Sequence, residues 1–281
     1  MMRTLAFRIV NVFARGGRFT GNPLCVFEDG MGLDDEQMQA LARQFNLSET
    51  TFILPSERAT ARVRIFTPAY EMPFAGHPTL GTAQVVRSLK GGGDSLSLEM
   101  KAGIIPVEAR ANRWTLTARP ASVRVPAESP SDIAAALGLT PADLASPPLW
   151  LNAGTEQMMV PVNTAEAVRR ARPDPARISA LQSREPIKAY IFFDEGDSAG
   201  RALARFFFPA GGALLEDPAT GSACANLGGW FRHLRPGDDV EREVSQGEQV
   251  ARPSTLKLSV KGGTVFVGGD VLDLGRGTIE L

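Results

Sequence analysis

Two distant stretches of this chain follow the same pattern, and this internal match limits the possible folds more than any other feature of the sequence. GHPTLGTA at residues 76–83 corresponds to EDPATGSA at residues 216–223. Upstream, TTFILPSERATARVRIFTP at 50–68 and AYIFFDEGDSAGRALARFFFP at 189–209 share an order of strand, turn, strand and proline. Because the pattern occurs twice only, it predicts two similar halves and not a solenoid.

Each copy places a polar residue, a proline and a glycine before a run of small residues that has the composition of a helix. In this alignment His77 corresponds to Asp217. The other matched positions are Pro78 with Pro218, Gly81 with Gly221, and Thr82 with Ser222. Free amides at a helix start stabilise a carboxylate or a developing enolate. One copy alone could equally be an ordinary strand-to-helix turn, but two matched copies favour binding of an acidic substrate.

Local patterns predict α+β elements in both halves. Leu5 to Val12 alternate as a first strand, and a helix is expected from Leu33 to near Asn46. Strands are expected at 50–54, 61–67, and in LSLEM, IIPVEAR and WTLTARP, and a buried helix at 79–89 is closed by Gly91, Gly92 and Gly93. The Pro- and Ser-rich passage at 120–130 predicts domains of 1–118 and 119–281, with the final strand a candidate to return to the N-terminal half.

Composition excludes several classes of function. Thirty basic residues against thirty-one acidic ones give no field that would gather nucleic acid, and no apolar run is long enough to span a membrane. The two cysteines and two histidines show no metal-ligand spacing, so we expect no metal and a reducing cytoplasm. The glycine-rich stretches have the wrong spacing for a dinucleotide or phosphate loop, so we expect no cofactor. The first residues alternate as a strand would and do not form a signal peptide.

Glu49 in NLSETTF is the candidate acid/base. It lies between a predicted helix and an apolar strand, where a carboxylate loses part of its hydration and becomes a stronger base. By local pattern alone, capping of a turn by Ser48 and Glu49 is the better interpretation. Glu71 is a weaker rival in a loop, and an isolated His77 is more often structural. Cys25 and Cys224 are predicted to be buried, inert thiols.

Four segments together resemble the PhzF-like phenazine-biosynthesis isomerases, a branch of the diaminopimelate epimerase and proline racemase fold. They are FTGNPLCVF at 19–27, NLSETTFIL at 46–54, RIFTPAYEMPFAGHPTLGTA at 64–83 and EDPATGSACANLGGW at 216–230. A late SQGEQVARPS at 245–254 extends the likeness over nearly the whole chain. As a set these motifs are highly specific.

The resemblance implies two pseudo-symmetric domains, each a curled mixed β-sheet around a central helix, with an active site in the cleft between them. It implies a cofactor-independent, cytoplasmic homodimer that moves a proton on a small acidic metabolite. Glu49 would be the general acid/base, and His77, Asp217 and Ser222 would orient substrate and relay protons. Substrate-binding positions would be Gly76, Pro78, Thr79, Thr220 and Gly221.

Two alternatives stay open. The epimerase and racemase relatives use a pair of cysteines, and the matching places here read Ala75-Gly76-His77 and Glu216-Asp217-Pro218, so a two-thiol mechanism is not expected. An epimerase that uses Glu49 and Asp217 from opposite faces is one alternative, and a carboxylate-binding protein without turnover is the other. The sequence departs from the family at Ala251, where a glycine before the Arg-Pro pair is common.

Overall fold

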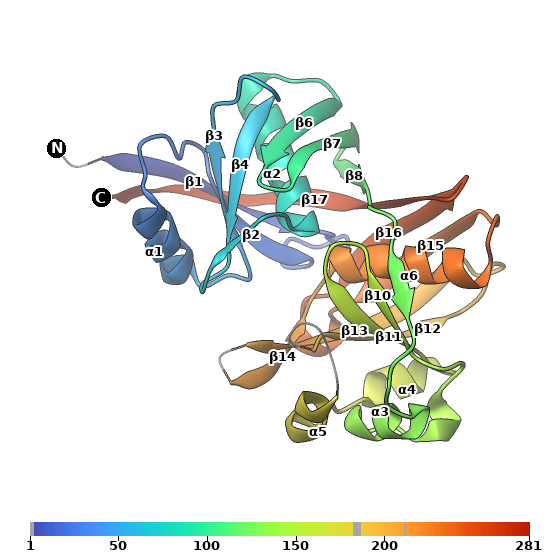
Figure 1. Ribbon diagram of the computed structural model, residues 1–281. Helices are drawn as coiled ribbons and strands as arrows, with labels where there is room; N and C mark the ends of the chain where they lie inside the picture. Colours follow the sequence, from blue (N-terminus) through green and yellow to red (C-terminus); the bar gives the residue numbers. More distant parts are fainter. Residues whose placement is uncertain (1–2, 182–186, 211) are drawn as a thin grey trace. The chain divides into compact units, whose positions relative to one another are not determined.

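The computed structural model describes residues 3–181, 187–210 and 212–281, and the chain forms two compact units. One unit consists of the chain up to Thr117 together with Gly268–Leu281, and the other consists of Ala118–Val267. The predicted α+β class is confirmed, because each unit is a mixed sheet curled around a central helix (Figure 1). Met1 and Met2, part of the segment predicted as a first strand, lie outside the described residues.

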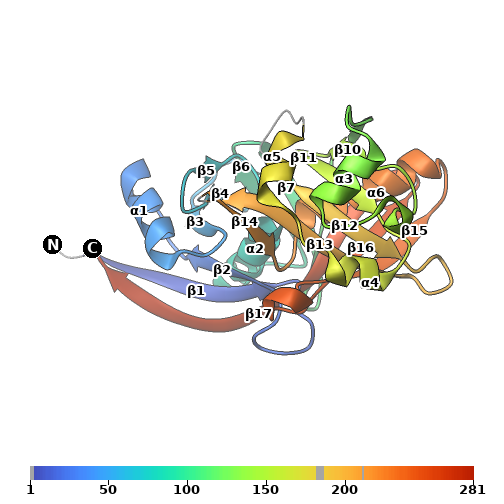
Figure 2. The same cartoon turned by 90° about the horizontal axis from the view of Figure 1, so that it is seen from below.

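Strands of the first unit close into a ring. They are β1 (Thr4–Val12), β2 (Asn22–Phe27), β3 (Thr50–Leu54), β4 (Ala61–Phe66), β5 (Glu71–Met72), β6 (Ser95–Met100), β7 (Gly103–Arg110), β8 (Arg113–Thr117) and the later part of β17 (Thr264–Glu280). Pairings run β1–β2–β3–β4–β6–β7–β8, and β17 joins β8 to β1. The long β1–β17 pair is visible in Figure 2. This closed sheet encloses a core large enough for one helix.

Helix α2 (Gly76–Lys90) occupies the inside of that ring and contacts β1, β2, β3, β4, β6 and β8. Gly81 allows the helix to come close to the sheet, because a Cβ there would lie 2.6 Å from Leu24 Cδ2 and 2.9 Å from Val12 Cγ2. The helix ends at Gly91, whose φ of 62° is left-handed. The sheet therefore holds the helix start in a fixed position.

Helix α1 (Asp35–Phe45) packs on the outside of the first unit. Asp34 and Gln37 form a capping box at its start, and Asn46 ends it in the left-handed conformation. Met38 and Leu41 join a core cluster with Phe27 and Phe52, whose rings stack with centroids 4.8 Å apart. This packing orders the segment between α1 and β3, in which Glu49 lies.

The second unit repeats the plan with longer connections. Its strands are β9 (Ser122–Arg124), β10 (Leu149–Asn152), β11 (Glu156–Pro161), β12 (Ala189–Asp194), β13 (Arg201–Ala210), β14 (Ala213–Asp217), β15 (Val240–Gln246), β16 (Ser254–Lys261) and the first part of β17. Helix α6 (Gly221–Leu234) is central and contacts β10, β11 and β16. Gly228 lies against β17, since a Cβ there would be 2.4 Å from Val265 Cγ1.

Three short helices cover the outer face of this second sheet, as Figure 1 shows. They are α3 (Pro130–Ala136), α4 (Ala165–Arg170) and α5 (Pro175–Ala180), and their apolar residues join one core cluster with Trp150, Val160 and Ile191. Short 3₁₀ turns lie at Pro141–Asp143 and Glu248–Val250. Burial on one face explains why these short helices are stable although they are too short to persist alone.

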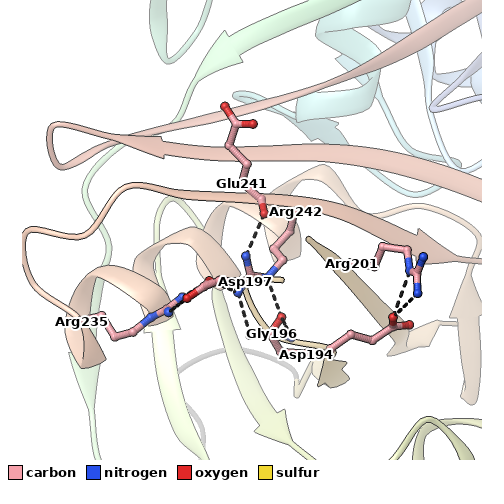
Figure 3. A network of polar contacts seen from close by, with 8 residues as sticks. Asp194, Gly196, Asp197, Arg201, Arg235, Glu241 and Arg242 are labelled. Atoms are coloured by element: carbon pink, nitrogen blue, oxygen red, sulfur yellow. Dashed lines mark hydrogen bonds and ion pairs between the residues drawn. The ribbon is translucent and has the colours of Figure 1, made fainter. Parts of the chain in front are cut away.

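An ionic network anchors the far end of α6 (Figure 3). The buried Arg242 on β15 donates to Asp194 Oδ1 at 2.5 Å and to Asp197 Oδ1 at 2.6 Å. Arg235, which follows α6, also donates to Asp197, and both guanidinium groups lie over the Phe231 ring. The network ties the β12–β13 turn and β15 to the C-terminal end of the helix. The N-terminal end of α6 lies at the candidate site.

The structure differs from expectation at β9, at the start of α2 and at the end of β13. Strand β9 lies inside the passage at 120–130, which predicts only a linker, and it pairs with β10. Helix α2 begins at Gly76, three residues before the predicted start at Thr79. Pro209 lies within β13 instead of ending it, because this strand continues into a hairpin with β14. No helix in the described part of the chain is both long and apolar enough to cross a membrane.

Candidate active site

The two central helices begin without the side-chain caps that the other helices have. Asp34, Ser129, Thr164 and Asp174 accept hydrogen bonds from first-turn amides of α1, α3, α4 and α5. Ala75 before α2 and Thr220 before α6 make no such bond, and neither first turn contains an acidic residue. Both starts therefore keep amides and a positive dipole end available to an anion.

Glu49 and His77 meet at the start of α2. Glu49 directly precedes β3 and its side chain is 16% exposed, and His77 is the second residue of α2 with a side chain 6% exposed. The distance from His77 Nδ1 to Glu49 Oε2 is 3.4 Å. A carboxylate with restricted access to water thus lies beside an imidazole and a helix N-terminus.

Burial lowers the pKa of His77 to about 3, and a hydrogen bond with the Pro23 backbone opposes this shift in part. The ring is therefore neutral at pH 7 and has one donor and one acceptor nitrogen. Its buried Nε2 has no hydrogen-bond partner among the described residues. A neutral imidazole next to Glu49 can hold or pass a proton without adding a fixed charge.

Asp217 ends β14 in the second unit, and its carboxylate is held by the residue that precedes α6. Thr220 Oγ1 donates to Asp217 Oδ2 at 2.5 Å. The buried Gln246 accepts from the Thr220 amide at 3.3 Å and donates to the Asp217 carbonyl at 2.8 Å and to Thr220 Oγ1 at 3.0 Å. Because Thr220 Oγ1 accepts from Gln246, its own proton is directed at Asp217.

Ser222 is the second residue of α6, and buried amides lie behind it. Gln157 Nε2 on β11 donates to Ser222 Oγ at 2.9 Å, and Asn226 Nδ2 on α6 donates to Gln157 Oε1 at 2.7 Å. Gln157 and Asn226 have no exposed surface, whereas Ser222 is partly exposed. The serine hydroxyl is therefore supported from the protein interior, on a residue that is itself partly exposed.

Strand pairing and the starts of the central helices give an alignment of the two halves that differs from the one predicted from the sequence. Arg64 makes a double hydrogen bond to Glu71, and Arg205 makes the same bond to Glu216, with each arginine also over a phenylalanine two residues on. Strand pairing places Glu71 opposite Phe66 and Glu216 opposite Phe207. The corresponding segments are thus EMPFAGH at 71–77 and EDPATGS at 216–222.

The predicted correspondence of His77 with Asp217 is therefore wrong by five residues. His77 matches Ser222, since each follows the first glycine of its helix, and Asp217 matches Met72 on β5. Pro78, Gly81 and Thr82 likewise do not correspond to Pro218, Gly221 and Ser222. The two places where racemase-like relatives would have thiols become Ala75 and Thr220, and again neither is a cysteine.

The remaining predicted positions fall into the same two helix starts. Gly76, Pro78 and Thr79 lie in the first turn of α2, and Thr79 Oγ1 donates back to the Ala75 carbonyl at 2.6 Å. Thr220 precedes α6 and Gly221 begins it. The structure thus brings together Glu49 and His77 in the first unit, and Asp217, Thr220, Gly221 and Ser222 in the second.

The rival candidates have structural roles. Glu71 is not a solvated loop carboxylate, because it lies on β5 and accepts from Arg64 and from Lys101 at 2.6 Å. Burial raises its pKa, but these hydrogen bonds outweigh burial and leave the pKa lowered. Cys25 and Cys224 are fully buried, as predicted, and burial raises the pKa of both thiols.

The sequence gives little signal for the supporting amides. Asn226 lies four residues after Ser222, on the same helix face, which a helical reading of GSACAN could have shown. Gln157 lies in the apolar strand EQMMVP, where nothing in the spacing links it to a distant serine. Within the described residues, no three His, Cys, Asp or Glu side chains are grouped in a way that could hold a metal ion.

Comparisons with known proteins agree with this architecture. Residues 10–270 match the PhzC-PhzF family model, described as phenazine biosynthesis-like protein. An uncharacterized isomerase of Pasteurella multocida is 37% identical over 99% of this chain and 95% of its own length. The trans-2,3-dihydro-3-hydroxyanthranilate isomerase of Pseudomonas chlororaphis is 34% identical over 97% of this chain and 98% of its own.

Solved structures show the same fold. A Bacillus anthracis phenazine biosynthesis protein of the PhzF family has a TM-score of 0.86 at 25% identity, covering 99% of both chains. A probable proline racemase from Agrobacterium radiobacter shares the fold at a TM-score of 0.62 and 11% identity, over 98% of this chain and 92% of its own. The fold and these relatives define a two-domain α+β isomerase. The chain belongs to the family of phenazine biosynthesis-like, or PhzF-like, proteins.

Proposed function

We propose that this isomerase moves a proton between two carbons of a small acidic metabolite, without a cofactor, and that Glu49 is the general acid/base. His77, Asp217 and Ser222 orient the substrate and relay protons. The observation that carries this proposal is the placement of the Glu49 carboxylate 3.4 Å from the neutral His77 ring at the uncapped start of α2. The names of the relatives support an isomerase reaction.

In the proposed reaction Glu49 accepts a proton from a carbon next to a carboxylate or a carbon–carbon double bond. The electron pair left behind delocalises into that conjugated group, and the double bond shifts. Protonated Glu49 then returns a proton to the other end of the conjugated system. One C–H bond breaks and another forms, so the composition of the metabolite is unchanged and no co-reactant is needed.

The uncapped helix starts support binding of an acid. Amides at the start of α2 and α6 point out of the helix with the positive ends of both dipoles, and neither first turn contains an acidic residue. Such groups also stabilise the negative charge that develops when the proton leaves. The metabolite is therefore proposed to carry at least one carboxylate.

Proton NMR in deuterated water tests this proposal. The panel contains trans-2,3-dihydro-3-hydroxyanthranilate, other cyclic and acyclic unsaturated acids, and amino and hydroxy acids, each incubated with native protein or with Glu49→Gln. New signals or deuterium uptake with the native protein, lost in Glu49→Gln, support proton transfer by Glu49. The labelled carbon separates isomerisation, where the double bond moves, from epimerisation, where one stereocentre inverts.

Two outcomes contradict the proposal. If Glu49→Gln labels the substrate as fast as the native protein, another residue is the base. If no acid reacts with either protein while some acids show line broadening on binding, the chain is a carboxylate-binding protein. We further propose a homodimer in the cytoplasm, on the strength of the family resemblance, and light scattering on the purified protein tests the dimer.

A further inference from the structure

We infer that Gln157 and Asn226 are positioning residues that fix the Ser222 hydroxyl as a hydrogen-bond donor to an acceptor atom of the substrate, such as a carboxylate oxygen. This inference rests on the proposed function for the identity of the acceptor. The direction of the hydroxyl itself follows from the hydrogen-bond network alone. All of the groups involved belong to the second unit.

Backbone groups fix the orientation of the Asn226 amide. The Ala153 N–H donates to Asn226 Oδ1 at 2.8 Å, and an N–H can act only as a donor. The Leu151 and Thr155 carbonyls accept from Asn226 Nδ2, each at 3.2 Å, and a carbonyl can act only as an acceptor. A reversed amide would place donor against donor and acceptor against acceptor in a buried region, which is strongly unfavourable.

The fixed amide of Asn226 then fixes Gln157. Asn226 Nδ2 donates to Gln157 at 2.7 Å, so the Gln157 atom at that position must be the oxygen Oε1. The other end of the Gln157 amide is consequently its nitrogen, which donates to Ser222 Oγ at 2.9 Å. Both amide side chains are completely buried, and water cannot compete for these bonds.

Ser222 is left with a proton to donate. Its oxygen already accepts from Gln157, and in the described part of the chain no acceptor takes the serine proton. Ser222 is partly exposed at the start of α6, beside the outward-pointing amides of the first turn. The hydroxyl therefore adds a side-chain donor to the backbone amides of a helix end that already favours an anion.

The described residues of the first unit do not repeat this pair of amides at the equivalent helix positions. In the corrected alignment Ser222 matches His77 and Asn226 matches Gly81, where a Cβ would already meet Leu24 Cδ2 at 2.6 Å. The two helix starts are thus built differently, with the proton-transfer pair Glu49 and His77 in one and a fixed donor in the other.

Gln157→Glu tests the inference with a side chain of the same shape. In its ionised form a carboxylate at 157 still accepts from Asn226, but it must also accept from Ser222 and would reverse that hydroxyl. Because burial favours the neutral carboxyl, kcat/KM is measured as a function of pH and compared where the carboxyl is ionised. We expect kcat/KM to fall about tenfold to a hundredfold, the range for loss of a hydrogen bond to a charged group. The substrate is the acid of the panel that the native enzyme labels.

A double-mutant cycle with Ser222→Ala separates this role from a structural one. If Gln157 acts through Ser222, Gln157→Glu lowers kcat/KM by less than about twofold in the Ser222→Ala background. A loss that is as large in that background as in the native one overturns the inference, because it would come from the new charge or from disturbed packing. Thermal unfolding of each variant identifies any loss of folded protein.

Neutron diffraction from crystals of the native protein exchanged into deuterated water tests the hydroxyl direction without a substrate. The inference predicts deuterium on Gln157 Nε2 directed at Ser222 Oγ, and the Ser222 deuterium directed away from Gln157. A Ser222 deuterium directed at Gln157 overturns it. If no acid of the panel is labelled, the proposed function fails, and the neutron result still decides this inference separately.

Discussion

His77 is held neutral by burial, and this has a consequence for folding stability. In the unfolded chain its pKa would be near the usual 6.5, whereas in the folded protein it is lowered to about 3. Between these two values the unfolded chain binds more protons, so stability falls as the pH falls from 6.5 towards 3. The contribution of the neutral His77 ring to folding stability is therefore fully present only above pH 6.5.

Replacement of His77 by glutamine should therefore flatten the loss of stability in acid. Urea unfolding at pH 7 and at pH 4 measures it for both proteins. We expect the native protein to lose about 3 kcal/mol more than His77→Gln over this range, at about 1.4 kcal/mol per pH unit below 6.5. Equal losses of stability in the two proteins would mean that the folded protein binds a proton at His77 as readily as the unfolded chain does.

Ala251 has a backbone conformation that suits glycine. Its φ is 54°, in the left-handed region, at the end of the 3₁₀ turn Glu248–Val250. Glycine, which the family resemblance leads us to expect at this position, would adopt this φ freely, whereas a side chain there costs about 1 to 2 kcal/mol.

Ala251→Gly should accordingly stabilise the protein by about 0.5 to 1 kcal/mol, less than the full strain because glycine also increases the entropy of the unfolded chain. Urea unfolding checks this. The matched control is Ala127→Gly, an exposed loop alanine without a positive φ, which should be neutral or destabilising. A loss of stability at Ala251 as large as at Ala127 would contradict the strain argument.

At the scale of elements, spacing and turn chemistry predict most of the structure. Helix α1, the strand pair β3 and β4 and the end of α2 at Gly91 follow from local sequence because capping and alternation are local. The alignment of the repeats does not follow from matched letters. It is set by the Arg64–Glu71 and Arg205–Glu216 pairs across strands, and the longer β13–β14 hairpin hides this equivalence in the sequence.

Packing of α2 inside its ring depends on Gly81. An alanine there favours the helix by about 1 kcal/mol, but its Cβ would lie 2.6 Å from Leu24 Cδ2, and overpacking of a core costs about 1 to 3 kcal/mol. We expect Gly81→Ala to lower the free energy of unfolding by about 1 kcal/mol, and by at most about 2 kcal/mol, in urea titration.

The matched control is Gly275→Ala on β17, where an added Cβ meets nothing within 4 Å. This exposed position should change the free energy of unfolding by less than about 0.5 kcal/mol. If Gly81→Ala is no more destabilising than Gly275→Ala, the space between α2 and strands β1 and β2 can hold a methyl group, and glycine is not required at position 81.

At the scale of the whole molecule, the two units share a plan but differ where chemistry is proposed. The position before β3 is Glu49, and the position before the equivalent strand β12 is Lys188, whose amino group donates to Thr155 Oγ1 at 2.5 Å. Local pattern made Glu49 a candidate only, because capping of a turn was the better local interpretation, and its proposed role came from the resemblance to the PhzF-like isomerases. Sequence reasoning could not identify Gln157, whose partner Ser222 lies 65 positions away along the chain.

We propose that Glu49, and not Glu71 of the same unit, transfers the proton. The most direct test compares rates of deuterium uptake into the reacting acid for native protein, Glu49→Gln and Glu71→Gln, since Glu71 is a largely buried carboxylate with an arginine partner. We predict that Glu49→Gln loses at least about a hundredfold in rate and that Glu71→Gln, once corrected for folded fraction, stays within about tenfold. A Glu49→Gln rate within a few fold of native, or an equal loss in Glu71→Gln, would contradict the account.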